Sequence, residues 1–374
     1  MNRTMKWMCC TLLVTAAWLA GNVAVAEEAV ETKKVTPKVQ IAILLDNSGS
    51  MGGLINQARS ELWKIVNEFA TSKQDGVAPD LEVAVYHYGN PPATKLVALT
   101  DDLDSVSAAL FGIPVNGGSE FCGEVIQSAT NDLEWSKNDR DLKLIFIAGN
   151  ERFNQGPVDY KEACRAAIQK GVIVNTIHCG SGIPDGWKQG AMLADGNSIN
   201  IDQNQAVVNI PAPQDKEIVE LGVKLNKTYI AFGARGREGA KEQAEQDGNS
   251  LGASMQSASS RAVTKANRFY KNSSWDLCDA YSDKKIDLEK IEESQLPENM
   301  RKMTVEERKS YVGQMQKKRE EIQKKINELN AQRTKYVAEK REKLAAENGK
   351  KTLDAALIES IHKQATKKNF TFGK

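Results

Sequence analysis

The sequence lacks the patterns of several common enzyme classes. It has only three histidines among 374 residues, and no HExxH pattern, which argues against a histidine-rich zinc enzyme. It contains neither GxGxxG nor GxxxxGK[ST], which excludes the standard dinucleotide and P-loop sites. Fifty basic residues against 49 acidic ones give a formal net charge of +1, so the overall charge does not favour a nucleic-acid partner. We expect no catalytic residues.

Long apolar runs are scarce. Residues 1–26 combine a basic start, an apolar stretch from Trp7 to Gly21 and the small-x-small sequence Ala24-Val25-Ala26, which is typical of a cleaved signal peptide. The apolar stretch is shorter than the roughly 20 residues that a membrane-spanning helix needs. No second long run follows. We therefore expect an exported protein, periplasmic or extracellular, with no membrane span after cleavage.

Cysteine is also sparse, and only four of the six cysteines follow the expected signal peptide: Cys122, Cys164, Cys179 and Cys278. No CxxC pattern is present, which argues against a zinc ribbon or a thioredoxin-like site. An oxidising compartment permits disulfides. A Cys122–Cys164 disulfide is geometrically reasonable, Cys179 competes for either partner, and buried free thiols are the alternative.

Apolar runs and amphipathic segments alternate along the first two hundred residues. The runs predict strands at residues 39–45, 81–88, 142–148, 172–178 and 198–201, with 95–99 as a hairpin partner of the second strand. Helical spacing marks residues 54–69, 104–110, 123–133, 159–170 and 187–193. This alternation predicts an α/β fold, a doubly wound and mostly parallel sheet covered on both faces. Ligands bind such sheets beyond the carboxyl ends of the strands.

The loop after the first strand concentrates oxygen donors. Asp46 ends the strand, and Ser48 and Ser50 follow within the tight sequence Asp-Asn-Ser-Gly-Ser-Met. A carboxylate and two hydroxyls are hard ligands that suit Mg²⁺, which retains several waters. An ordinary turn, with Asp and Ser capping the next helix, is the alternative interpretation.

This strand, the D-x-S-x-S-M loop and the following helix resemble a von Willebrand factor type A (VWA) domain, a Rossmann-like fold, over residues 38–230. The resemblance implies that the loop is the first part of a metal-ion-dependent adhesion site (MIDAS). The family's second element is a threonine in a Gly-Gly-Thr loop, and Ser119 stands in that position here. Its third element is an aspartate after the strand at 142–148, where this sequence has Gly149.

The glycine at position 149 leaves two alternatives for the third element. Either Glu151 or Asn150 supplies an oxygen from a shifted loop, or the ion is held by one carboxylate fewer and more weakly. The resemblance implies a divalent cation, Mg²⁺ or a similar ion, with an open coordination position. An exposed acidic residue of a protein partner fills that position in the family, so a non-enzymatic binding module is expected.

The rest of the chain is polar and helical in pattern. We expect a disordered lead-in at 27–37, a strand at 228–232, a helical connector at 231–283 and a charged helical extension at 284–374. Within the extension, a capping box predicts a long helix at about 304–347, and a last helix is expected at 353–365. Alternating Phe370 and Phe372 favour an edge strand or a plug in a groove.

The long helix carries a half-formed heptad repeat, made by Met315, Ile322, Leu329 and Tyr336. It can form a coiled coil, fold back on a neighbouring helix, or stand alone in solvent. Acidic residues outnumber basic ones before residue 281 and the reverse holds after it, so the tail either is a solvated surface or docks on an anionic partner. A metal-independent scaffold that self-associates through this tail is therefore the alternative to the binding module.

Overall fold

The computed structural model describes residues 35–201, 210–348 and 353–373. The expected signal peptide and most of the lead-in lie outside this part of the chain. No helix within the described part is long and apolar enough to cross a membrane.

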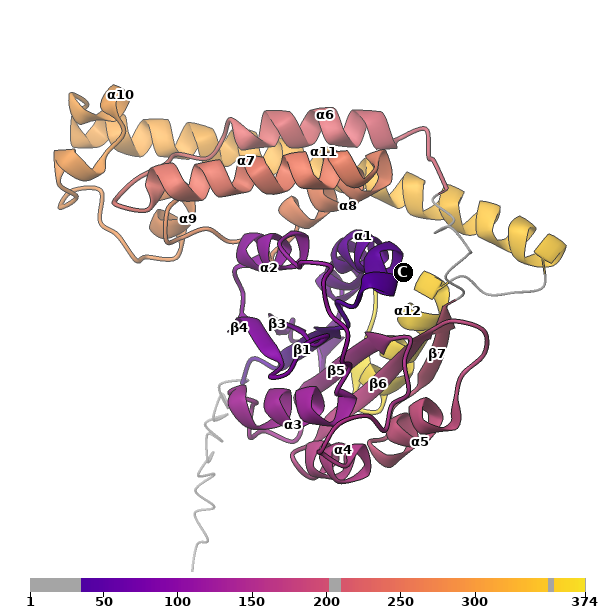
Figure 1. The fold of residues 1–374 in the computed structure, drawn as a ribbon. Coiled ribbons are helices and arrows are strands. Elements are labelled where there is room, and N and C mark those ends of the chain that lie inside the picture. Colours follow the sequence, from indigo (N-terminus) through magenta and orange to yellow (C-terminus); the bar gives the residue numbers. More distant parts are fainter. Residues whose placement is uncertain (1–34, 202–209, 349–352, 374) are drawn as a thin grey trace, which may run out of the picture. The chain divides into compact units, whose positions relative to one another are not determined.

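A six-stranded sheet forms the centre of the first two hundred residues (Figure 1). The strands, in spatial order, are β4 (Thr94–Thr100), β3 (Asp80–His87), β1 (Lys38–Leu45), β5 (Leu142–Gly149), β6 (Val172–Cys179) and β7 (Ser198–Ile201). All pairs are parallel except β3 with β4, which are antiparallel as the hairpin prediction requires. The chain winds from β1 towards β3 and then continues from β5 towards β7, so the direction of winding reverses between β1 and β5. Their carboxyl ends therefore flank the crevice in which ligands of such sheets bind.

Two layers of helices cover the sheet, because successive residues of its buried strands point to opposite faces. One face of β1, including Ile41 and Ile43, packs with α1 (Gly52–Ala70) and α2 (Leu103–Phe111). The other face, including Leu44, packs with the remaining helices of the sheet region. These are α3 (Cys122–Asp132), α4 (Tyr160–Gln169) and α5 (Asp185–Leu193). The doubly wound prediction is confirmed, with every element within a few residues of its expected bounds.

The C-terminal segment belongs to the core of the sheet. Leu357 and Ile361 of α12 (Leu353–Thr366) lie in the same apolar cluster as α1 and β1. Phe370 is 1% exposed in that cluster, and β8 (Phe370–Thr371) pairs antiparallel with β2 (Lys73–Gln74). The edge-strand prediction for these residues is confirmed. The helices between β7 and α12 thus form an insertion within the chain of the sheet domain.

The inserted segment is helical. Its elements are α6 (Asp215–Asn226), α7 (Gly236–Ala253), α8 (Met255–Lys265), α9 (Leu277–Ser282), α10 (Glu298–Arg301) and α11 (Val305–Asn348). The strand predicted at 228–232 is wrong, since the backbone makes only an isolated bridge between Ala231 and Asp276. The apolar side chain of Ile230 packs among Leu277 and Leu288 instead, and in the described part of the chain the bridge is not extended into a ladder.

The first part of α11 packs against its own chain. Its capping box forms as predicted, since Thr304 N donates to Glu307 Oε2 (2.8 Å) and Glu307 N donates to Thr304 Oγ1 (3.3 Å). Ile326 is buried and Ile322 and Leu329 are partly buried in a cluster with α6 and α8. The folded-back alternative therefore holds for this half of the helix, which lies along α6 in Figure 1.

A buried ionic network joins the sheet region to the inserted helices. Arg261 of α8 is 1% exposed and pairs with Asp104 of α2 (Nη1–Oδ1 2.8 Å) and with Asp247 of α7. Lys265 pairs with the second oxygen of Asp247 (2.6 Å). Burial acts to raise the pKa of Asp247, but Arg261 and Lys265 hold it below its ordinary value, so this carboxylate stays ionised.

Replacing Arg261 by methionine is expected to destabilise the protein strongly. The change leaves the buried carboxylate of Asp104 without its cation and removes one of the two cations of Asp247, and breaking such a buried pair costs about 3–5 kcal/mol. Denaturant unfolding measures the loss. Lys241→Met is the matched control, because Lys241 is an exposed lysine on α7 that pairs with Glu245, and it should change stability by no more than about 0.5 kcal/mol. Equal unfolding midpoints for the two variants would contradict a structural role for the network.

Candidate functional site

Three loops meet near the carboxyl ends of β1 and β5. They are the loop after β1, the loop after β3, which contains Gly89, and the loop before α3. The loop after β1 is tied to the loop before α3 by a bridge between Ser48 and Gly117. The backbone N–H groups of Gly118 and Ser119 both donate to Gly89 O, at 2.6 and 2.8 Å. Ser119 is thereby placed beside the first loop, as the sequence predicts. A Cβ on Gly117 would lie 2.6 Å from Gly89 Cα, so this close approach requires glycine.

Asp46 provides a buried carboxylate at the centre of these loops. It is 0% exposed, and its Oδ1 accepts a hydrogen bond from Ser48 N (2.7 Å). Its Oδ2 is buried and has no hydrogen-bond partner within the described part of the chain. Burial raises the pKa of Asp46 to about 6, hydrogen bonds from Ser48 act against this rise, and the charge of Glu120 adds to it. A buried carboxylate oxygen without a partner is costly unless something binds to it.

Glu120 supplies a second carboxylate. It is not among the ligands predicted from the sequence. It is 6% exposed, and the side chains of Ser48 and Gln155 hydrogen-bond to it. Burial raises its pKa, and the nearby charge of Glu151 raises it further. Ser48 therefore lies between the carboxylates of Asp46 and Glu120. In the sequence, Glu120 could have been recognised as a possible ligand by its position directly after Ser119.

Glu151 and Ser50, the other predicted ligands, are less well defined. Glu151 is exposed at the rim of the site, within electrostatic range of Glu120. The side chain of Ser50 lies outside the described part of the structure. The site therefore rests on Asp46, Ser48, Ser119 and Glu120.

Position 149, where the family has its third carboxylate, has no space for a side chain. A Cβ on Gly149 would lie 2.6 Å from the Tyr88 hydroxyl and 3.3 Å from Asp46 Cβ. Tyr88 is 2% exposed, and its hydroxyl donates to Ala148 O (2.8 Å), which fixes the ring in this place. Position 149 is a glycine because Tyr88 occupies the space that a larger residue would need.

The oxygen donors present fit a divalent cation that retains water. Two carboxylates and the serine hydroxyls are the hard ligands that Mg²⁺ prefers. The unpartnered Oδ2 of Asp46 offers such an ion a buried ligand. In the described residues no three acidic, histidine or cysteine side chains form a group that could hold a metal ion by themselves.

The disulfide prediction is not confirmed, because all four cysteines after residue 35 are buried free thiols. Cys122 Sγ donates to the Tyr88 hydroxyl (3.9 Å) and Cys179 Sγ to Ile177 O (3.8 Å). Burial raises the pKa of Cys164 to about 12, which keeps this thiol protonated and unreactive. These side chains pack as small apolar groups in the core.

Residues 248–252 read Gly-Asn-Ser-Leu-Gly and match the GxSxG pattern of serine hydrolases, but their setting is wrong for it. The pattern needs a sharp turn between a strand and a helix, and these residues lie inside α7. Ser250 is 0% exposed, and its hydroxyl accepts a hydrogen bond from Trp63 Nε1 (3.1 Å). This serine is a core residue.

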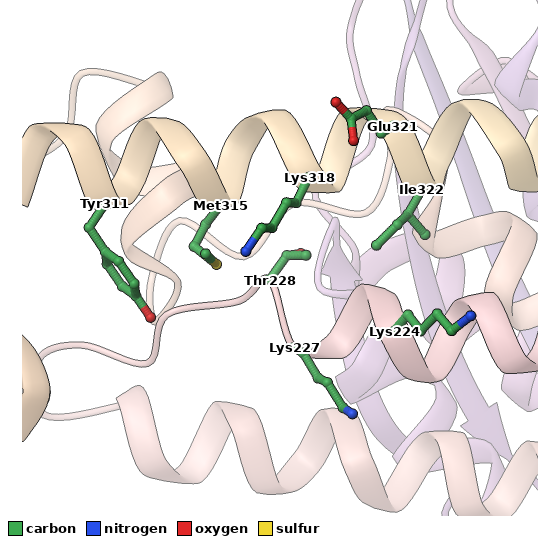
Figure 2. A pocket seen from close by; sticks show the side chains of 8 residues that line it. All are labelled: Lys224, Lys227, Thr228, Tyr311, Met315, Lys318, Glu321 and Ile322. Atoms are coloured by element: carbon green, nitrogen blue, oxygen red, sulfur yellow. The ribbon is translucent and has the colours of Figure 1, made fainter.

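A separate hollow of about 380 Å³ lies between α11 and the end of α6 (Figure 2). Three of its lining residues are lysines, of which only Lys318 belongs to the predicted basic tail. Figure 2 shows the Lys318 side chain pointing towards Thr228, whereas Lys224 and Lys227 point away from it. The three ammonium groups do not converge, so the hollow has no centre for an anion.

The chain is similar to several solved structures, among them a VWA domain. The chain is 17% identical to the SpRpn10 VWA domain, over 46% of this chain and 91% of that one, with a TM-score of 0.37. It is 19% identical to BatB from Bacteroides thetaiotaomicron, over 44% and 90%, with a TM-score of 0.35. For proximal thread matrix protein 1 from the mussel byssus, with a zinc-occupied MIDAS motif, the identity is 17%, the coverage 46% and 43%, and the TM-score 0.38.

No curated protein gives a significant match to the chain. The family model of the von Willebrand factor type A domain matches residues 40–208, which contain all of the six-stranded sheet except the first two residues of β1, and all three loops of the site. The chain therefore carries a VWA domain at residues 40–208, a member of a family of generally non-enzymatic interaction modules.

Proposed function

We propose that the protein is an exported binding module whose VWA domain holds Mg²⁺ or a similar divalent ion and engages a protein partner through it. Asp46 and Glu120 supply the carboxylates, and Ser48, Ser50 and Ser119 supply hydroxyls. The ion contributes a Lewis-acidic contact point that remains partly hydrated. The ion would offer a binding point for an acidic side chain of the partner, and export would place the module where such partners are found.

The buried, unpartnered Oδ2 of Asp46 is the observation that carries this proposal. Without a cation, Asp46 and Glu120 repel one another across Ser48, and each pays a desolvation cost. A divalent ion between them removes both costs. Glu120 takes the part for which the sequence offered Glu151 or Asn150, because Glu120 is buried beside Ser48 whereas Glu151 is exposed.

The alternative scaffold, which would assemble through the tail, has less support. The apolar residues of α11 from Val312 to Leu329 already pack on the chain's own helices. Of the heptad positions, only Tyr336 lies beyond this packed part. Self-association would therefore have to use the more polar end of the helix.

Titration calorimetry with Mg²⁺ and Mn²⁺ tests the metal site. We expect saturable binding to the purified chain in the micromolar-to-millimolar range, and none to Asp46→Asn, which keeps an acceptor for Ser48 N but loses the charge. Glu120→Gln should weaken binding by at least about ten-fold, or 1.4 kcal/mol. Glu151→Gln is the matched control at the rim and should change binding by less than about three-fold.

Two results would count against the proposal. Identical titrations of the wild-type chain and Asp46→Asn would remove the metal site. A partner that binds equally well in EDTA and in Mg²⁺ would leave the module intact but without a metal bridge.

A further inference from the structure

A second cavity lies at the opposite end of the sheet from the metal site, where β5 begins. Its volume is about 650 Å³, within the range of about 300–1,000 Å³ that is common for small-molecule sites. The segment between α3 and β5 forms one wall and the turn between α4 and β6 the other. Its lining residues are Thr130, Leu133, Glu134, Trp135, Ser136, Lys137, Asp139, Lys143, Gln169 and Lys170.

Lys143 places a buried ammonium group in this cavity. The residue is 2% exposed, and its Nζ donates to two backbone carbonyls, Ser136 O (2.9 Å) and Lys170 O (2.8 Å). An ammonium group has three donors, so one N–H remains for an occupant of the cavity. Burial lowers the pKa of Lys143, and the charges of Asp139 and Asp141 offset only part of this effect.

No carboxylate in the described part of the chain forms an ion pair with Lys143. The nearest acidic residue in the sequence, Asp141, is already engaged, because its Oδ2 accepts from Ser136 Oγ (2.6 Å) and its Oδ1 from Lys38 N (3.0 Å). Asp139 and Glu134 are exposed at the mouth. Buried charges in proteins are normally paired, so the missing anion points to a ligand.

The walls of the cavity are held in place before any ligand arrives. Trp135 Nε1 donates to Ala129 O (2.9 Å), which fixes the indole ring, and Leu133 is buried beside it. Lys170 Nζ donates to Thr130 O (2.9 Å) and Asn131 Oδ1 (3.0 Å), which ties the second wall to α3. A fixed apolar surface next to a single buried cation suits a molecule with a ring and one negative charge.

We propose that this cavity binds a small aromatic carboxylate, with the carboxylate on the Lys143 ammonium and the ring against Trp135 and Leu133. The site is independent of the proposed metal site, since Lys143 lies near the amino end of β5 and the metal site at its carboxyl end.

Benzoate and its uncharged isostere benzamide are the probes for the test. We expect benzoate to bind the purified, deuterated chain saturably in NMR titrations and benzamide to bind at least about ten-fold more weakly, a difference of 1.4 kcal/mol. Lys143→Met should abolish benzoate binding. Lys216→Met, a variant of an exposed lysine on α6 that does not line the cavity, should retain binding within about three-fold.

Equal affinity for benzoate and benzamide, or benzoate binding that survives in a folded Lys143→Met variant, would overturn the proposal. If that variant fails to fold, the shift pattern of the wild-type chain decides. Shifts concentrated at residues 133–139 and 169–171 and at the Trp135 indole N–H support the site, and shifts elsewhere overturn it. EDTA should leave benzoate binding unchanged, which separates this test from that of the metal site.

Discussion

A chain that ends at residue 348 is expected to lose the cooperative unfolding of its VWA domain. The missing segment contributes Leu357, Ile361, Ala365 and Phe370, each at most 4% exposed, to the main core cluster. Removing a single buried Leu, Ile or Phe side chain down to alanine costs about 2–5 kcal/mol. Losing several together approaches the whole stability of a domain, about 5–15 kcal/mol. Thermal unfolding followed by circular dichroism, together with the soluble fraction on expression, measures the effect.

Point variants on α12 test whether the loss of stability comes from core packing or merely from shortening the chain. Ile361→Ala should lower stability by about 2–5 kcal/mol, whereas Lys363→Ala, exposed on the same helix, should change it by no more than about 0.5 kcal/mol. A truncated chain with the same unfolding midpoint as the full chain would show that α12 is not part of the domain.

Polar contacts also tie α12 to the sheet. The side chain of Asn175, buried in β6, exchanges hydrogen bonds with Gln364 (2.7 and 3.1 Å), and it accepts one from Ser360 Oγ (3.2 Å). The match to the VWA family model ends at residue 208, yet the domain's core includes residues after 352. The inserted helices are therefore enclosed by the sequence of the domain that they extend.

The sheet could be predicted because its strands are long apolar runs bounded by turns. All eight residues of β5 and of β6 are buried, and such strands leave a signal that depends on their own residues alone. The oxygen donors of the first loop were likewise readable, since Asp46, Ser48 and Ser50 lie within five residues. Ser119 followed from the resemblance to the VWA family, whereas Glu120 was found only in the structure.

The remaining features depend on contacts between residues far apart in the sequence. The apolar stretch around Ile230 is as typical of a strand as β7 is, but only the fold shows that no strand lies beside it. The heptad positions of α11 have the same pattern whether they meet a second chain or the chain's own α6 and α8. A single sequence does not distinguish these cases, because the partner surface is formed by tertiary packing.

The reason for a glycine at position 149 also depends on tertiary packing. A substitution at this position tests the site. Gly149→Asp restores the family's third carboxylate in sequence, but we expect it to destabilise the protein by about 1–3 kcal/mol or more, because the new Cβ collides with the Tyr88 hydroxyl. It should also fail to strengthen Mg²⁺ binding. Thermal unfolding with and without Mg²⁺, and the metal titration described above, measure both effects.

Adding Tyr88→Phe to Gly149→Asp should make room for the new side chain, so that the added carboxylate strengthens Mg²⁺ binding. Without the hydroxyl, the closest remaining contacts of the new Cβ are 3.2 Å to the Trp187 ring and 3.3 Å to Asp46 Cβ, which small shifts can relieve. The double variant should bind Mg²⁺ at least about ten-fold more tightly than the wild-type chain, since it has one more carboxylate. Because that carboxylate crowds Asp46 and Glu120, the double variant should depend on the metal for stability and unfold early in EDTA.

Tyr88→Phe alone is the control, and it should cost only about 1 kcal/mol for the lost hydrogen bond to Ala148 O. The two substitutions are therefore expected to be strongly non-additive, because each determines whether the other fits. If Gly149→Asp alone tightened Mg²⁺ binding without loss of stability, Tyr88 would not be what closes the third position. The absence of a carboxylate at 149 would then need another cause.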